Sequence, residues 1–506
     1  MNIYTLSKYV DALEQAGLVK DVNLYGSEDV KVENVTFNSK ESSDGTLFIC
    51  KGAAFKGEYL MQALDAGAFV YVSEIQYEVG GDVPHIIVSD IRKAMPVIAA
   101  LYYNEPQKDI KIASVTGTKG KSTTSYYIKA IIDDYMAAQG HIDCGITSTI
   151  DTYDGVVRLE SHNTTPESVE VYKHLRNAVN SGMEYMVMES SSQALKYHRV
   201  DGVTFDVGIM LNISEDHISP IEHQDFEDYF SSKLKIYDQS RVGVVNLDAQ
   251  FFERSLKAAA KCEKVITFSQ EKPEADIYGY NVRKVGHEII FNVRSHSFDE
   301  EFKITMPGLF NVENALAAIC TAYEFGIPVE YMKSGLYRAR SKGRMEAYAT
   351  KDGKVIVIVD YAHNKLSFEK LFESTKKEYP DYKISVVFGC PGRKALIRRH
   401  DLGVSAGEHA DRIYIVPEDP ATEDPFAIAE EVAEYIKPFN KPYVIINDRG
   451  EGLKKAVEDA KEKTVVLITG KGNETRQFIQ GVYVDCPSDI DYAIKFVDEY
   501  NMKYCN

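Results

Sequence analysis

A turn rich in glycine and lysine has the residue types and the spacing that bind phosphate. Residues 114–124 read SVTGTKGKSTT, between an apolar segment and a helical pattern. Glycines let backbone N–H groups turn towards a phosphate, and a helix N-terminus adds partial positive charge. The lysine that opens the helix can reach β- and γ-phosphates, and the hydroxyls after it can meet Mg²⁺. The candidate nucleotide-binding residues of this turn are Gly117, Thr118, Lys119, Gly120, Lys121, Ser122 and Thr123.

The turn departs from the complete P-loop pattern at one position, because Val115 stands where the pattern has its first glycine. A glycine- and serine-rich turn that contains lysine by chance is the alternative. The strand, loop and helix that the motif requires are all indicated by the sequence, which favours phosphate binding. A P-loop by itself does not distinguish a nucleotide switch from a motor or a synthetase.

Three further residues are candidates for a catalytic centre near this loop. Glu189 ends one apolar segment and His217 follows another, and a carboxylate with an imidazole near a phosphate loop makes a plausible Mg²⁺ site. Mg²⁺ prefers oxygen ligands and keeps several waters, so each residue alone could equally be an ordinary hydrogen-bonded side chain. The third residue is Lys233, in the segment FEDYFSSKLKIYD. Considered by itself, it would be a solvated lysine on a helix.

The elements that must position these residues alternate between apolar and helical segments, which predicts an α/β fold of three domains. A small α/β unit over residues 1–109 ends at the polar connector NEPQKD. Residues 110–345 are predicted to form a mostly parallel sheet with a hairpin near 287–306. The alternation restarts in residues 346–506, which indicates a doubly wound, Rossmann-like domain. Ligands bind such sheets at the carboxyl ends of the strands, where the polar residues of this chain fall.

Length and composition limit the class of protein. The 506 residues are enough for about three domains, and the formal charge of −18 argues against a broad nucleic-acid interface. Seven scattered cysteines without a CxxC pair fit reduced thiols better than disulfides or a zinc site. No apolar stretch is long enough to span a membrane, and the N-terminus is typical of an amphipathic helix. We therefore expect a cytoplasmic protein without nucleic-acid or membrane partners.

The variant TGTKGKST, taken with segments elsewhere in the chain, resembles the Mur ligases, the ATP-dependent enzymes that add amino acids in peptidoglycan synthesis. The pattern of NTTP and SSxALxxHRV looks most like the branch that adds the third residue. The resemblance implies three domains, for a UDP-sugar, for ATP and for the incoming amino acid. The segments that carry it, in family order and spacing, are HNTTPES (162–168), MESSSQALKYHRV (188–200), NISEDHI (212–218), FNVENALAAI (310–319), GRMEAY (343–348), DYAHN (360–364) and GKGNET (470–475).

The resemblance implies roles for the residues around the phosphate loop. Glu189 and His217 would hold Mg²⁺, with Ser122 or Thr123 on the nucleotide side, and Lys121 would stabilise the transferred phosphoryl group. Lys233 matches the carbamylated lysine of the family, whose modification turns a cation into an anion that can hold a second Mg²⁺. The residues that would contact the nucleotide from other segments are Asn311, Asn314, Arg344 and Asp360.

The candidate site for the sugar substrate combines hydroxyl side chains with one arginine. Hydroxyl groups and a fixed cation suit a phosphorylated sugar that carries a peptide. The NTTP segment could equally be a helix N-cap with proline at position N1. The sequence departs from the family at Gln193 and Tyr197, where His and Gln are usual, and at Lys40, where Arg is usual. The candidate residues for the sugar substrate are Ser39, Thr164, Thr165, Ser191 and Arg199.

The third domain should select the incoming amino acid. Family members that add meso-diaminopimelate carry Asp-Asn-Pro-Arg after a strand, and the arginine suits the second carboxylate of that substrate. Here residues 418–421 read Glu-Asp-Pro-Ala, so the arginine is absent. Glu418 and Asp419 suit a cationic side chain such as that of lysine, although a solvated acidic turn is the alternative. Three more residues would complete the site. Glu474 would bind an amino group of the incoming amino acid, Arg393 would bind its α-carboxylate, and Gly470 would lie beside them.

The resulting prediction is a monomeric ligase that uses ATP and Mg²⁺. It would join a diamino acid, L-lysine first, to UDP-N-acetylmuramoyl-L-alanyl-D-glutamate through an acyl phosphate, with domain closure assembling the site. L-Ornithine satisfies the same charge argument, and meso-diaminopimelate stays open if another cation replaces the missing arginine. Folylpolyglutamate synthetase, a related ligase, and a non-catalytic P-loop switch are the alternatives in function.

Overall fold

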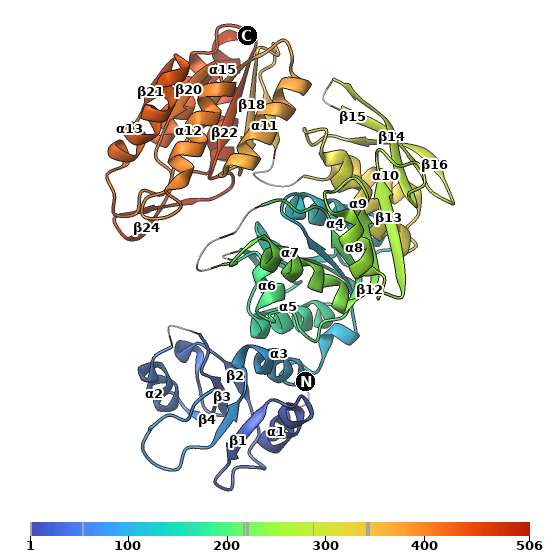
Figure 1. The fold of residues 1–506 in the computed structure, drawn as a ribbon, viewed down its shortest axis with the longest axis vertical. Helices are drawn as coiled ribbons and strands as arrows, with labels where there is room; N and C mark the ends of the chain where they lie inside the picture. The colour runs from blue at the N-terminus through green and yellow to red at the C-terminus, as the bar shows by residue number, and fades with distance from the viewer. Residues whose placement is uncertain are drawn as a thin grey trace. The chain divides into compact units, whose positions relative to one another are not determined.

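The structure is a computed structural model that describes residues 3–52, 55–161, 163–215, 218, 222–286, 288–340 and 345–505. Its helices and strands build three α/β regions, each around its own large sheet (Figure 1), as the sequence predicts. Contacts between Cα atoms group the chain into two compact units. These are residues 1–278 with 316–335, and residues 279–315 with 336–506.

The first unit begins with a five-stranded sheet in the order β1-β5-β4-β3-β2. Neighbouring strands are parallel except β1, which is antiparallel to β5. Side chains alternate along a strand, so Leu47 and Ile49 join the core of α1 and α3, whereas Phe48 joins the core of α2. The elements are α1 (Leu6–Gln15), β1 (Val19–Asn23), β2 (Asn34–Thr36), η1 (Ser39–Glu41), β3 (Thr46–Ile49), α2 (Gly57–Asp65), β4 (Ala68–Ser73), β5 (His85–Val88), α3 (Ile91–Tyr102) and η2 (Pro106–Lys108).

The second sheet has eleven strands in the order β16-β15-β14-β13-β12-β11-β6-β10-β7-β8-β9. Its middle is parallel from β7 through β10, β6, β11, β12 and β13 to β14. The elements from β6 to β14 are β6 (Lys111–Thr116), α4 (Lys121–Ala138), β7 (Gly145–Thr147), β8 (Asp151–Tyr153), β9 (Arg158–Glu160), α5 (Ser168–Asn180), β10 (Tyr185–Glu189), α6 (Ser192–Lys196), β11 (Phe205–Met210), α7 (Phe226–Leu234), η3 (Lys235–Gln239), β12 (Ser240–Asn246), α8 (Phe252–Ala259), β13 (Lys264–Ser269) and β14 (Ile277–Val285).

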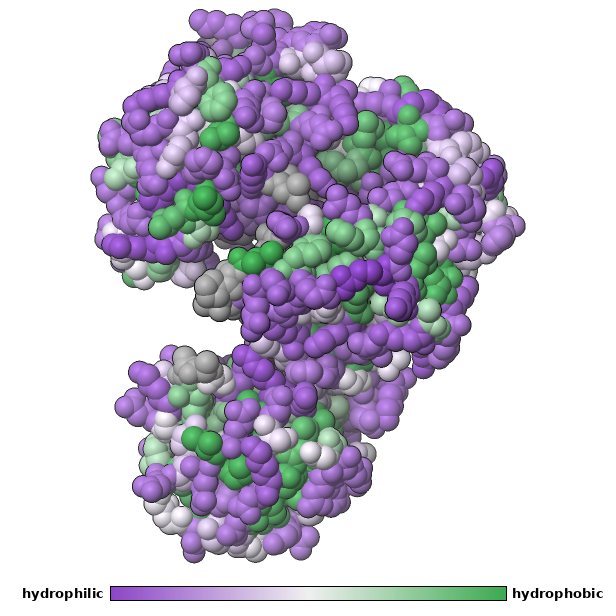
Figure 2. Space-filling view, in the orientation of Figure 1, coloured by the Kyte–Doolittle hydropathy of each residue, from purple (hydrophilic) through white to green (hydrophobic). Residues whose placement is uncertain are grey.

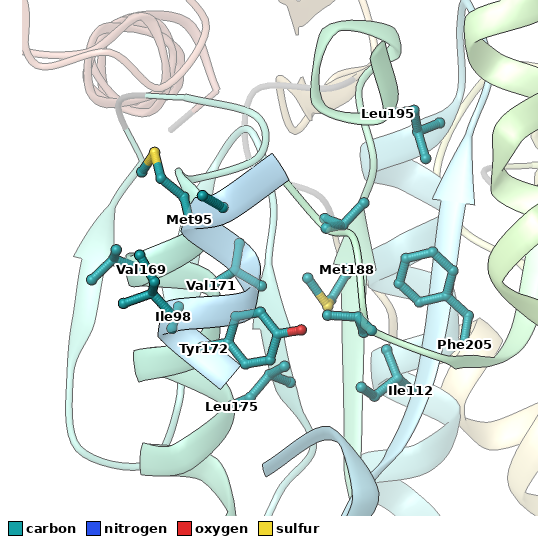
Figure 3. Packing of buried hydrophobic residues seen from close by; sticks show 14 of the residues in the cluster. Met95, Ile98, Ile112, Val169, Val171, Tyr172, Leu175, Met188, Leu195 and Phe205 are labelled. Carbon is teal, nitrogen blue, oxygen red and sulfur yellow. The ribbon is translucent and has the colours of Figure 1, made fainter. Parts of the chain in front are cut away.

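One continuous core joins the first two sheets. Met95 and Ile98 of α3 lie beside Val169 and Tyr172 of α5, and the cluster continues to Met188 on β10 (Figure 3). Each of these side chains is at least nine-tenths buried. Burying a side chain of this size stabilises the fold by roughly 1.5–3 kcal/mol, so α3 is held firmly on α5.

The second unit contains a hairpin and a six-stranded sheet in the order β17-β18-β22-β19-β20-β21. Strand β17 is antiparallel and the other five are parallel. Helices α11, α12 and α13 pack on one face, and α14 and α15 on the other, which makes the sheet doubly wound. The elements are β15 (Glu288–Arg294), β16 (Asp299–Ile304), α9 (Asn311–Glu324), α10 (Val329–Arg338), β17 (Glu346–Ala349), β18 (Val355–Asp360), α11 (Lys365–Glu378), β19 (Lys383–Phe388), α12 (Ile397–His409), β20 (Arg412–Ile415), α13 (Pro425–Ile436), η4 (Lys437–Phe439), β21 (Tyr443–Ile445), α14 (Arg449–Glu458), β22 (Thr464–Thr469), β23 (Arg476–Ile479), β24 (Val482–Asp485) and α15 (Asp489–Tyr504). Helix α9 ends in residues of the first unit, and α10 begins in them.

The face seen in Figure 2 is mostly hydrophilic, in keeping with the formal charge of −18. In the part of the chain that the structure describes, the longest apolar helical stretches fall short of what crossing a membrane requires. The domain limits at residues 109 and 345 stay predictions, although β6 begins at Lys111, directly after the first predicted limit.

Candidate active site

The phosphate loop follows β6, which lies between β11 and β10 at the middle of the large sheet. Asn212, two residues after β11, holds the loop in place. The N–H of Thr118 donates to the Asn212 carbonyl (3.1 Å), and the N–H of Lys119 donates to its side-chain oxygen (2.9 Å). Gly117 has φ +153°, and a Cβ there would lie 3.0 Å from the Cβ of Leu211. The close approach of the two strand ends therefore requires glycine at the first position of the loop.

Two lysine side chains converge on the loop. The Nζ of Lys121 donates to the carbonyls of Gly117 (2.9 Å) and Thr118 (3.3 Å). The Nζ of Lys233, from α7, donates to the same Gly117 carbonyl (2.9 Å). Lys233 is only 2% exposed, so the alternative of a solvated helix lysine is wrong. Its neighbour Tyr229 shares a hydrogen bond with the Thr118 hydroxyl (3.1 Å), which ties α7 to the loop.

Glu189 ends β10 one strand away from the loop, in register with Val115 of β6. Its side chain is fully buried. It accepts hydrogen bonds from the N–H of Thr149 (3.1 Å) and from the Thr149 hydroxyl (3.0 Å). Buried carboxylates are expensive unless they are paired. The Glu189 carboxylate and its two donors from Thr149 therefore lie at the carboxyl end of the parallel strands, the end that carries the phosphate loop.

The oxygen groups at this edge fit a magnesium ion by type. Thr116, the last residue of β6, has a buried hydroxyl with no hydrogen-bond partner among the residues that the structure describes. Ser122 and Thr123 place two more hydroxyls in the first turn of α4, and Glu189 adds a carboxylate, so the set is rich in the ligands that Mg²⁺ prefers. Within the described ranges, no group of three or more His, Cys, Asp or Glu side chains is spaced to hold a metal. The predicted ligand His217 lies outside the described residues.

The candidate sugar-binding residues form one hydrogen-bonded web beside Glu189. The Thr165 hydroxyl donates to the Glu189 carbonyl (2.8 Å) and accepts from the N–H of Ser191 (3.0 Å). The Thr164 hydroxyl accepts from that of Thr149 (3.1 Å). The Ser191 hydroxyl caps α6 by accepting from the N–H of Ala194 (3.1 Å). Thr165 is fully buried, so its hydroxyl holds the backbone around Glu189.

The alternative interpretation of the NTTP segment as a helix N-cap is wrong. The N-cap of α5 is Glu167, and the helix begins at Ser168, after the threonines and the proline. Glu167 forms a capping box with Glu170, which satisfies the first N–H groups of the helix. The two threonines are therefore free of a capping role and belong to the web around Glu189.

A three-residue ion cluster lies next to this web and contains a residue that sequence reasoning missed. Glu167 binds the Arg199 guanidinium (3.0 Å) and the Lys51 ammonium (2.8 Å) through the same carboxylate oxygen. Arg199 also donates to the Thr165 carbonyl (3.1 Å). Lys51 comes from the loop after β3, so the cluster joins the small sheet to the large one. Two cations on one carboxylate leave net positive charge where an anionic substrate is expected.

The remaining predicted residues are divided between the two units. In the first unit, Ser39 opens η1, and its hydroxyl donates to Gln62 (3.1 Å). In the second unit, the Asn314 side chain donates to that of Asn311 (2.8 Å), and both are buried at the start of α9. The Asp360 carboxylate accepts from the N–H of Met345 (2.9 Å). Arg344, the residue before Met345, lies outside the described residues.

The acidic loop of residues 418–421 lies at the carboxyl end of the six-stranded sheet. Two glycines allow this loop to approach the end of β19. A Cβ on Gly389 would lie 2.3 Å from the Val416 carbonyl oxygen, and one on Gly392 would lie 2.0 Å from that of Pro420. The hairpin β23–β24 closes the other side, because the N–H of Ala421 donates to the Phe478 carbonyl (2.9 Å). Backbone contacts on both sides therefore fix the loop.

The three carboxylates of this region differ in how their charges are compensated. The Lys471 ammonium pairs with Asp419 (2.8 Å) and with Glu474 (2.6 Å), and it is buried. Glu418 has no ion pair within 4 Å in the described structure, and burial raises its pKa to about 7 despite the cations around it. The alternative of a solvated acidic turn over residues 418–424 is wrong for Glu418, which is 8% exposed, whereas Thr422 and Asp424 are exposed. Glu418 is therefore the carboxylate with spare capacity for a cation.

The predicted carboxylate-binding arginine lies on an exposed bend of the neighbouring loop. Arg393 has a positive φ of 61°, and its Nε donates to the Thr422 hydroxyl (3.1 Å). The buried arginine in this segment is Arg399, which pairs with Glu423 (2.8 Å) and Glu431 (2.6 Å). Glu423 also accepts from the N–H of Arg393. Arg399 thus anchors the loop while Arg393 presents its guanidinium at the surface.

Comparisons with known proteins agree with this geometry. Residues 115–322 match the model of the Mur ligase middle domain, and residues 343–472 match that of the Mur ligase glutamate ligase domain. The UDP-N-acetylmuramoyl-L-alanyl-D-glutamate--L-lysine ligase of Streptococcus pneumoniae serotype 2 is 36% identical over 501 residues. That match covers 96% of this chain and 98% of the relative. The chain belongs to the Mur ligases.

Two further relatives place this Mur ligase within its family. A Streptococcus agalactiae serotype Ia enzyme of the same name is 38% identical over 475 residues, covering 92% of this chain and 93% of that one. Among solved structures, a UDP-N-acetylmuramoyl-L-alanyl-D-glutamate--2,6-diaminopimelate ligase has a TM-score of 0.68 at 23% identity. It covers 99% of this chain and 100% of its own, which confirms the predicted three-domain α/β fold. The resemblance found in the motifs is confirmed over the whole chain.

Proposed function

We propose that this Mur ligase adds L-lysine to UDP-N-acetylmuramoyl-L-alanyl-D-glutamate and uses ATP to form the amide bond. The observation that carries the proposal is the state of the acidic loop. Lys471 pairs with both Asp419 and Glu474, Glu418 stays available to a cation, and Ala421 supplies no arginine for a second carboxylate. The names of the two streptococcal relatives support the same substrates. We further propose that the enzyme acts in the cytoplasm as a monomer.

The phosphate loop would bind ATP through its backbone N–H groups and Lys121. A carboxylate oxygen of the D-glutamate attacks the γ-phosphorus, the bond to the β–γ bridging oxygen breaks, and ADP leaves. Negative charge is spread over the transferred phosphoryl group in this step, so fixed cations stabilise it more than the ground state. We assign this role to Lys121, and the contacts of its ammonium with the Gly117 and Thr118 carbonyls support the assignment.

Glu189, the hydroxyls of Ser122 and Thr123 and, outside the described residues, His217 would hold Mg²⁺. When bound, Mg²⁺ offsets the negative charge of the phosphates and the reacting carboxylate. Lys233 would join these ligands only as a carbamate, because an ammonium group is a donor without a lone pair. The burial of the Lys233 side chain beside Gly117 supports a role at the phosphate loop. Thr149 and Thr165 would then orient Glu189 from behind.

The α-amine of lysine attacks the acyl carbon in the second step, the acyl carbon–oxygen bond breaks, and phosphate leaves. The α-ammonium loses one proton to solvent before the attack, and the nitrogen loses a second proton to solvent as phosphate leaves, so that the amide keeps one. The positively charged cluster of Lys51, Glu167 and Arg199 would bind the anionic part of the sugar substrate. Arg393 would bind the α-carboxylate of lysine, and Glu418 would bind the distal ammonium. Orientation of the two reactants contributes much of the rate enhancement in such reactions.

The experiment that tests this proposal offers three amines separately with UDP-N-acetylmuramoyl-L-alanyl-D-glutamate and ATP. L-Lysine, L-ornithine and meso-diaminopimelate are compared by phosphate release and by product mass. We expect turnover with lysine, weaker turnover with ornithine and the lowest with diaminopimelate. Turnover with diaminopimelate instead would keep the ligase assignment and overturn the argument from residues 418–421.

The alternatives in function predict different results in the same assay. Folylpolyglutamate synthetase would require a folate substrate, and the match of the whole chain to the streptococcal ligases argues against it. A non-catalytic nucleotide switch would release phosphate at a rate independent of both the carboxylate and the amine. Such a rate would overturn the ligase assignment.

A further inference from the structure

A buried ion pair lies beneath the acidic loop and has no place in the mechanism above. Arg449 is the first residue of α14, and Asp489 is the first residue of α15. The Nε and Nη2 of Arg449 donate to the two carboxylate oxygens of Asp489, each at 2.7 Å. Arg449 is 9% exposed and Asp489 is 1% exposed. A two-point arrangement of this kind fixes the orientation of the guanidinium as well as its charge.

We call the proposed binding place of the lysine ammonium at Glu418 the ammonium pocket. The remaining contacts of the ion pair reach the backbone on both sides of it. Arg449 donates to the carbonyl of Thr469 (2.8 Å), the residue before Gly470, and to that of Pro417 (3.3 Å), the residue before Glu418. Asp489 accepts from the N–H of Gly472 (3.1 Å). One ion pair therefore joins the ends of β20 and β22 and the turn that follows β22.

The charges around Glu418 give Arg449 a second effect. Arg449 is the largest favourable charge for the Glu418 carboxylate, and Arg398 from α12 and Lys471 after β22 add to it. Asp419 opposes them from the same loop, and the Cys390 thiol after β19 also lies close. Lys471 is already committed to Asp419 and Glu474. Arg449 is thus the main cation that balances the burial of Glu418.

We propose that Arg449 is a positioning residue of the amino-acid site, which fixes both strand ends around the pocket and supplies the fixed positive charge behind Glu418. The proposal rests on the lysine-adding function proposed above. The geometry assigns Arg449 to specificity rather than to the chemical step, because its contacts are to backbone carbonyls and to Asp489. Its loss should therefore weaken amino-acid binding and leave ATP binding unchanged.

Two variants separate positioning from charge. Arg449→Lys keeps a cation beside Asp489 but loses the fork that reaches two carbonyls. Arg449→Met combined with Asp489→Leu removes both charges, since removing one partner alone would leave an unpaired buried charge. The control is Arg412→Met, because Arg412, the first residue of β20, pairs with Asp459 (3.0 Å), the C-cap of α14. That pair lies at the opposite edge of the sheet.

The readouts are the KM for lysine, the KM for ATP and the pH dependence of kcat/KM for lysine. We expect Arg449→Lys to raise the KM for lysine by about tenfold, the equivalent of one lost hydrogen bond to a charged group. The KM of this variant for ATP should stay within twofold of the parent value. The inflection in its pH profile of kcat/KM for lysine should stay near that of the parent protein. The double variant should raise the KM further and move the inflection to higher pH. Arg412→Met should change none of these.

The outcomes distinguish this proposal from the function on which it depends. A parent protein without lysine-dependent turnover would overturn the proposed function. A parent protein with such turnover, and an Arg449→Lys variant with an unchanged KM for lysine, would overturn the positioning role. An unmoved inflection in a folded double variant would overturn the role of the charge. If the double variant fails to fold, the KM of Arg449→Lys still decides the positioning role.

Discussion

The state of Glu418 predicts how lysine use should depend on pH. Burial raises the pKa of this carboxyl from 4.5 to about 7, so the group is protonated below pH 7 in the free enzyme. A cationic side chain binds the ionised form, and lysine binding should therefore weaken as pH falls through 7. A group with this pKa is ionised in about one molecule in eleven at pH 6 and about ten in eleven at pH 8. The change in the ionised fraction of Glu418 should by itself change kcat/KM for lysine by about tenfold between pH 6 and pH 8.

The matched variant for this prediction is Glu418→Gln, which keeps the shape of the side chain and removes its charge. Lysine also loses protons from its α-amine as pH rises, which adds a slope to every profile. Dividing the parent profile by that of Glu418→Gln cancels this slope, because both proteins use the same amine. The ratio should rise by about tenfold between pH 6 and pH 8 and level off above it. Steady-state phosphate release at saturating ATP and sugar substrate provides the measurement.

Two results would refute this reasoning. A ratio that stays flat between pH 6 and pH 8 would mean that the ionisation of Glu418 does not control lysine binding. An unchanged kcat/KM for lysine in Glu418→Gln at pH 8 would mean that Glu418 does not contact the substrate. Loss of a buried ion-pair partner typically costs about 3–5 kcal/mol, so the expected decrease in kcat/KM is about a hundredfold or more.

Three other substitutions test separate parts of the site. Ala421→Arg should lower kcat/KM for lysine and raise it for meso-diaminopimelate, because it adds a cation for the second carboxylate; competition between the two amines measures the ratio. Glu189→Gln should raise the Mg²⁺ concentration for half-maximal turnover by about tenfold or more, read from a magnesium titration. Lys233→Ala should lower turnover by a factor of about 10² or more. Lys235→Ala, two residues away, should keep turnover within twofold of the parent value. Equal effects of the two substitutions would contradict the assignment of Lys233 to the active site.

The sequence alone was sufficient to predict the phosphate loop and the main strands. The glycine-rich turn follows β6 as expected, and the predicted hairpin near 287–306 is β15 paired with β16. These signals are local, since they depend on periodicity and turn residues within a short window. The hairpin β23–β24 was not predicted, because its short strands lack the alternation that marks a strand.

Contacts between distant segments were beyond the sequence. Lys471 belongs to the GKGNET segment, yet only the fold shows that it neutralises Asp419, 52 positions earlier in the chain. Asn212 holds the phosphate loop from the end of β11, 93 positions after Lys119. Lys51 and Arg449 carry no local signal, because a lone cation in a sequence is usually a solvated one. Their roles depend on tertiary contacts that place buried charges together.

The central claim is that this Mur ligase forms an acyl phosphate and then an amide. The most direct test labels the carboxylate oxygens of the D-glutamate in the sugar substrate with ¹⁸O and runs the reaction with ATP and lysine. We predict that the released phosphate carries one ¹⁸O, because the oxygen that attacks the γ-phosphorus leaves with it. Phosphate without label, released alongside an unchanged sugar substrate, would contradict the acyl phosphate and the ligase function together.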